Sequence, residues 1–68
     1  MADRIKREIE ELREAVRALD TALSYVIRVA EFLHARRYDV AADLADLATF
    51  WLRRANEHLA AAAEGEAL

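Results

Sequence analysis

The fold is decided by residues 5–33, which read IKREIEELREAVRALDTALSYVIRVAEFL. Their apolar residues recur at alternating steps of four and three, which is the heptad period of a helix that packs along one stripe. This spacing predicts one continuous helix over residues 3–36, about 50 Å long at 1.5 Å per residue. The stripe consists of Ile5, Ile9, Leu12, Val16, Leu19, Leu23, Val26, Ala30 and Leu33.

A turn and a second helix follow. The heptad phase is lost around residues 36–39, where Asp39 is a candidate N-cap. We expect the second helix over residues 39–64, with Gly65 as its stop. The two helices then form an antiparallel hairpin, and residues 1–68 form a single all-α domain. The predicted inner stripe of the second helix consists of Leu44, Leu47, Ala48, Trp51, Leu52, Ala55, Leu59 and Ala62.

The composition supports an all-α chain and excludes several other classes. The 68 residues include one glycine and no proline, too few for the turns of a sheet protein. The absence of cysteine excludes disulfides, a thiolate nucleophile and a zinc ribbon. A chain of this length buries only about 60% of the surface that it exposes when unfolded, so the core of one copy is marginal. With 56% hydrophobic residues, the chain carries more apolar surface than a lone hairpin buries.

The apolar residues are spread over more than one stripe of each helix. Tyr25 and Val29 flank the heptad stripe of the first helix, and Phe50 lies beside Trp51 in the second. By count, we expect residues 3–11 to project beyond the second helix. These features predict a homodimer, or a higher oligomer, in which hairpins form a four-helix bundle with coiled-coil-like packing. The expected interface residues are Ile5, Ile9, Leu12, Val16, Leu19, Leu23, Val26, Phe32, Phe50 and Trp51; a larger protein that binds Phe50 and Trp51 is the alternative partner.

Charge and hydropathy limit the kinds of partner that we expect this chain to bind. The formal net charge is -3, which lacks the basic excess that binding to nucleic acid normally requires. No apolar run approaches the roughly 20 residues that span a bilayer, so no membrane contact is expected. The first residues lack an apolar signal core, and we therefore expect a cytoplasmic protein.

Two histidines are the candidate site residues. Glu31 and His34 have the Glu-x-x-His spacing of helix-bundle metal sites, and His58 of a second chain could join them across an antiparallel dimer. Both Glu31 and His34 occupy outward heptad positions, which favours solvated side chains over metal ligands. Arg53 and His58 have an Arg-x4-His spacing that resembles the ribonuclease motif of HEPN domains, and this resemblance would imply RNA processing. We predict neither a catalytic residue nor a cofactor, and a chain that is not an enzyme.

Residues 24–59 also resemble small archaeal helical-hairpin proteins of the domain-of-unknown-function 357 family. The resemblance implies a helical hairpin that tends to associate, and no activity. Arg36 and Arg37 stand where those proteins have a glycine in the turn. The regular heptads and scarce loop residues would equally suit an engineered helical protein. The matching positions are Ser24, Tyr25, Ala30, Phe32, Leu33, Tyr38, Ala41, Ala48, Trp51 and Leu52.

Overall fold

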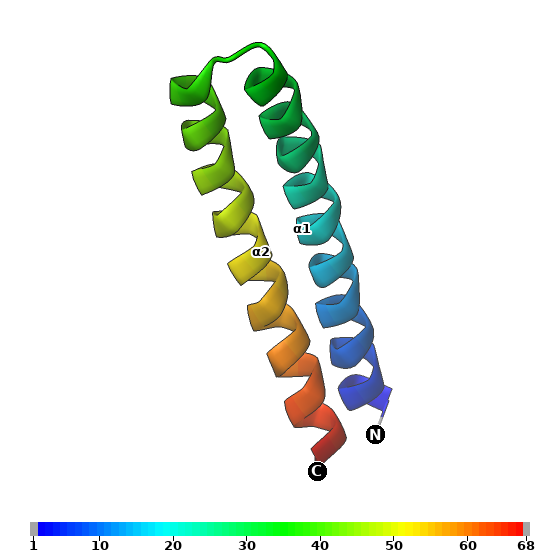
Figure 1. Ribbon diagram of the computed structural model, residues 1–68. Helices are drawn as coiled ribbons and strands as arrows, with labels where there is room; N and C mark the ends of the chain where they lie inside the picture. The colour runs from blue at the N-terminus through cyan, green and yellow to red at the C-terminus, as the bar shows by residue number, and fades with distance from the viewer. Residues whose placement is uncertain (1, 68) are drawn as a thin grey trace.

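The computed structural model describes the backbone of residues 2–67 and the side chains of residues 2–64. Helix α1 spans Ala2–His34 and helix α2 spans Tyr38–Ala67. They lie side by side in opposite directions, with the turn at one end of the rod and both termini at the other (Figure 1). The predicted all-α antiparallel hairpin is therefore confirmed. The predicted bounds of 3–36 and 39–64 differ from the observed ones. Helix α1 ends earlier than predicted, and α2 continues through Gly65.

The end of α1 is set by backbone hydrogen bonds around Arg36. The N–H of Arg36 donates to the carbonyl of Leu33 at 3.0 Å, and the N–H of Arg37 donates to the carbonyl of Phe32 at 2.8 Å. This pair of bonds is the Schellman motif, which places the residue after the helix cap in the left-handed region. Arg36 occupies that position with φ 59°. A residue with a Cβ thus fills a place that glycine usually takes.

The start of α2 differs from the prediction. The N–H of Ala41 donates to the carbonyl of Arg37 at 3.0 Å, which makes Arg37 the N-cap. Asp39 is instead in the first turn of α2, so its assignment as the N-cap was wrong. Its carboxylate lies 3.6 Å from Nε of Arg37 and is favourable near the positive end of the helix dipole.

Replacing Arg36 with glycine is expected to raise the free energy of unfolding by about 0.5–1 kcal/mol, because a side chain in the left-handed region is strained and glycine is not. Urea unfolding at one fixed protein concentration measures this change. Ala35→Gly is the matched control, since Ala35 is exposed in the same turn and does not have a positive φ. Equal stabilisation by both substitutions, or destabilisation by Arg36→Gly, would contradict this reading of the turn.

Alanine methyl groups form the buried contact between α1 and α2. Among the described residues, the buried alanines of α2 recur every seven residues, and α1 contributes buried alanines at its middle, over residues 15–22. Small residues at a helix contact permit axes at the short end of the usual 8–10 Å separation. We call these residues the alanine stripe. It consists of Ala15, Ala18, Ala22, Ala41, Ala48, Ala55 and Ala62.

The predicted inner stripe of α2 is correct only in part. Leu44 and Trp51 are half-buried beside the alanine stripe. Leu47, Leu52 and Leu59, in contrast, are 42% to 48% exposed, so their assignment to the inside of the hairpin was wrong. Because the alanine methyl groups bring the two helices close, the larger side chains are displaced to the flanks of the contact.

The two helices are matched in length. A hydrogen bond between Glu11 and His58 places these residues at the same level of the rod. Because α2 continues for nine residues beyond His58, its last turns lie alongside the first turns of α1. The prediction that residues 3–11 project beyond α2 was therefore wrong, and these residues give no separate support to self-association.

Candidate functional site

The heptad stripe of α1 is exposed along its whole length. Its eight large residues are 42% to 58% exposed, from Leu19 at the lower limit to Ile5 at the upper. At 3.6 residues per turn, this stripe lies roughly a quarter of a turn around α1 from the alanine stripe. We call it the α1 seam: Ile5, Ile9, Leu12, Val16, Leu19, Leu23, Val26, Ala30 and Leu33.

Two leucines of α2 lie on the same side of the hairpin as the α1 seam. Going around α1 from Glu11 in the direction of increasing residue number, Ala15 comes first and Leu12 second. Going around α2 from His58 in the same way, Ala62 comes first and Leu59 second. Because Glu11 and His58 meet at one edge of the helix contact, the two leucines lie together at the opposite edge. The α1 seam, Leu52 and Leu59 thus form one continuous surface, which we call the leucine face.

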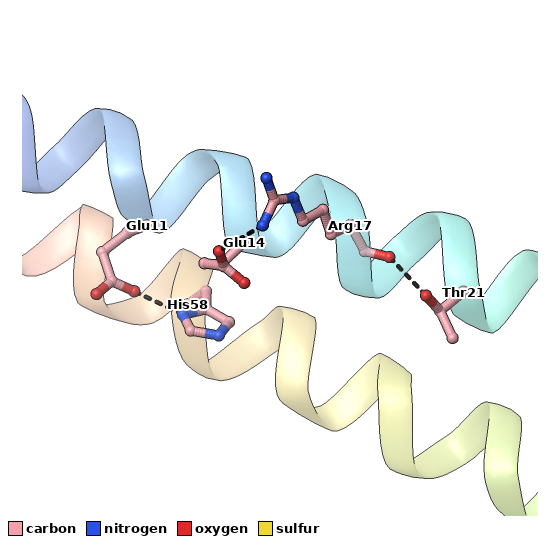
Figure 2. A network of polar contacts seen from close by, with 5 residues as sticks. All are labelled: Glu11, Glu14, Arg17, Thr21 and His58. Atoms are coloured by element: carbon pink, nitrogen blue, oxygen red, sulfur yellow. Dashed lines mark hydrogen bonds and ion pairs between the residues drawn. The ribbon is translucent and has the colours of Figure 1, made fainter.

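The opposite side of the hairpin is more polar along α1. Nδ1 of His58 donates to Oε2 of Glu11 at 2.7 Å, and these two side chains are 26% and 29% exposed, respectively (Figure 2). Further along α1, Arg17 bonds Glu14 at 3.2 Å, and the hydroxyl of Thr21 donates to the carbonyl of Arg17 at 2.9 Å. Glu14 and Thr21 therefore lie on a polar flank of α1, whereas Arg17 also borders the groove that Leu12 and Val16 of the α1 seam line.

The pair of Glu11 and His58 is expected to contribute about 1 kcal/mol of coupling to the free energy of unfolding, because both side chains are mostly shielded from water. A double-mutant cycle with Glu11→Gln and His58→Ala measures this coupling. The exposed pair of Glu14 and Arg17 is the matched control, for which we expect less than about 0.5 kcal/mol. Equal coupling in the two cycles would contradict a specific role for the interhelix pair.

The candidate metal ligands are separated within one chain. Glu31 and His34 are exposed near the turn, whereas His58 lies level with Glu11, about 35 Å along the rod from His34. Among the described residues of one chain, no group of three or more His, Cys, Asp or Glu side chains is placed to hold a metal ion. Only a second chain could bring Glu31 and His34 near His58.

The Arg-x4-His pattern is placed on α2. Arg53 is exposed and His58 is half-buried with Nδ1 bonded to Glu11. The hydrogen bond links α1 to α2 and gives His58 a structural role in the hairpin. Sequence reasoning missed this pair, because a contact between residues 47 positions apart depends on the register of the two helices.

The three aromatic residues predicted at the interface lie in different surroundings. Phe32 and Trp51 are half-buried in the hairpin, and the ring of Trp51 meets the ring of Phe50 edge-on at 5.4 Å. Phe50 itself is 52% exposed. Phe50 directly precedes Trp51 in the sequence and lies on the flank of α2 that carries His58. It is therefore on the side of α2 away from Leu52 and Leu59.

Comparisons with known proteins give no further guidance. The chain matches no protein-family model, and searches of curated proteins and of solved structures also yield no match. Within the described residues, neither helix has an apolar segment long enough to cross a membrane. The candidate functional site is therefore defined by its physical chemistry alone, as an apolar surface that extends along the rod.

Proposed function

We propose that this chain is a non-enzymatic assembly module that binds a second copy of itself through the leucine face. Two hairpins packed face to face form a four-helix bundle, in which the leucine faces become the core. The observation that carries this proposal is the exposure of every large residue in the α1 seam. Contiguous apolar surfaces of this kind normally mark an interface.

The large accessible surface of one copy supports a partner that covers part of it. The accessible surface is 5512 Å², whereas a folded monomer of 7.7 kDa is expected to expose about 4,300 Å². The backbone forms a rod with extents of 52, 14 and 11 Å, so its broad face covers about 700 Å². This footprint is close to the roughly 800 Å² per partner of a standard interface. A second copy therefore supplies enough contact for a stable complex.

The distribution of hydrophobic side chains points the same way. Each buried alanine methyl group contributes only about 0.8 kcal/mol, whereas full burial of a leucine or isoleucine contributes about 1.5–3 kcal/mol. Among the described residues, the fully buried ones are all alanines, whereas Phe32, Leu44 and Trp51 are half-buried. A large part of the hydrophobic free energy available to this chain is therefore gained only when the leucine face is covered.

Folding coupled to association makes stability depend on protein concentration. The thermal midpoint is expected to rise by several degrees over a hundredfold increase in concentration, because mass action favours the folded dimer. Circular dichroism at micromolar and higher concentrations measures the midpoint. A cooperative transition whose midpoint stays constant over that range would contradict the proposal.

A further inference from the structure

Charged residues line the outer edge of the α1 seam, which is the edge away from α2. Lys6, Arg13 and Asp20 recur there every seven residues. Arg13 borders one shallow groove with Ile9 and Val16 of the seam, and Lys6 borders the adjoining groove with Ile5. From Lys6 and Arg13 to Asp20 the sign of the charge changes from positive near the start of α1 to negative at its middle, while Glu10 and Arg17 border the same grooves. An edge with two signs can match itself only in particular orientations.

We propose that two copies pack with their turns at opposite ends, so that α1 lies against α1 of the second copy and Arg13 faces Asp20 of that copy. This inference rests on the proposed function, because it needs the leucine faces to meet. The two-fold symmetry of a homodimer then produces the contact twice. The structure thus indicates the orientation of the partner as well as its identity.

The register of this pairing fits the length of the helices. In an antiparallel pair, Arg13 meets Asp20 of the second copy when the symmetry axis passes near the residue midway between them, at about position 17. Helix α1 spans Ala2–His34, so its middle lies at about position 18. The two charged contacts therefore form when the rods overlap over almost their full length.

The reverse orientation lacks this complementarity. With both turns at the same end, α1 would face α2 of the second copy rather than its α1. Because Glu11 lies level with His58, Arg13 would then lie level with about residue 56 of that helix. Arg53 and Glu57 are both exposed beside this level, so their opposite charges give Arg13 no net attraction there.

A charge-exchange experiment tests the orientation. Arg13→Glu and Asp20→Arg are prepared as separate proteins, each of which opposes like charges in its own homodimer. When the two are mixed, opposed turns restore two attractive contacts in the heterodimer. At low ionic strength we expect heterodimer at least about fivefold above the statistical fraction, measured by native mass spectrometry, and a smaller excess in 1 M salt. A statistical mixture would overturn the proposed contact.

A second measurement is independent of these charges. Ala35→Cys places one fluorophore at the exposed turn of each copy. Energy transfer in a mixed donor and acceptor sample is expected to be weak, since opposed turns lie about 50 Å apart along the 52 Å rod. Strong transfer in a sample that sediments as a dimer would overturn the orientation alone. A monomer in the same sedimentation experiment would instead contradict the proposed function, and the orientation with it.

Discussion

Replacing Leu19 with glutamate is expected to raise the dissociation constant of the proposed dimer about a thousandfold or more. Leu19 lies at the middle of the α1 seam and is the least exposed of its large residues. In each copy the dimer no longer buries the exposed part of this leucine, about 1 kcal/mol, and the new carboxylate costs more because it has no partner in an apolar core. Since a homodimer contains the substitution twice, the loss is doubled.

Ser24→Glu is the matched control, because it adds the same charge to an exposed position of α1 away from the seam. Sedimentation velocity is expected to show a dimer for this control and a monomer for Leu19→Glu. Circular dichroism should also show a large loss of helix in Leu19→Glu at micromolar concentration. Equal affinity of the two variants would contradict the assignment of the leucine face as the interface.

Replacing Ala22 with leucine is expected to lower the free energy of unfolding by about 1–3 kcal/mol per chain. Ala22 is 1% exposed, and three additional carbon atoms at this position have no space between α1 and α2. The helices must separate or the leucine must adopt a strained rotamer. Chemical unfolding at fixed protein concentration measures the loss.

The control for this substitution is Ala61→Leu, at an exposed position of α2. Leucine and alanine have similar helix propensities, so this variant should change stability by only a few tenths of a kcal/mol. If Ala22→Leu were as stable as Ala61→Leu, the close contact along the alanine stripe would be contradicted.

The sequence predicted the helices and their antiparallel arrangement, but not which stripe of α1 contacts α2. Both the seam and the stripe of Ala15 and Ala22 repeat every seven residues, and periodicity alone does not rank them. The spacing of Ala41, Ala48 and Ala55 is the signal that identifies the small-residue contact. Matched alanines on two helices indicate close approach, which leaves the leucines for another partner.

The turn and the interhelix pair show two further limits. Arg36 adopts a left-handed conformation, at a position where a glycine would have indicated the end of the helix. Because no glycine stands there, the end of α1 was predicted two residues late. The contact between Glu11 and His58 depends on the register that this turn sets. Heptad spacing in each helix determines which residues share a face. The axial register of the two helices, in contrast, depends on the turn that connects them.

Sedimentation equilibrium of the unmodified chain tests the central claim most directly, because it measures molar mass without a label or a substitution. Samples over a hundredfold range of micromolar concentration are expected to fit a single reversible equilibrium between a monomer of 7.7 kDa and a species of twice that mass. A folded helical monomer at every concentration would contradict the claim that a second copy covers the leucine face.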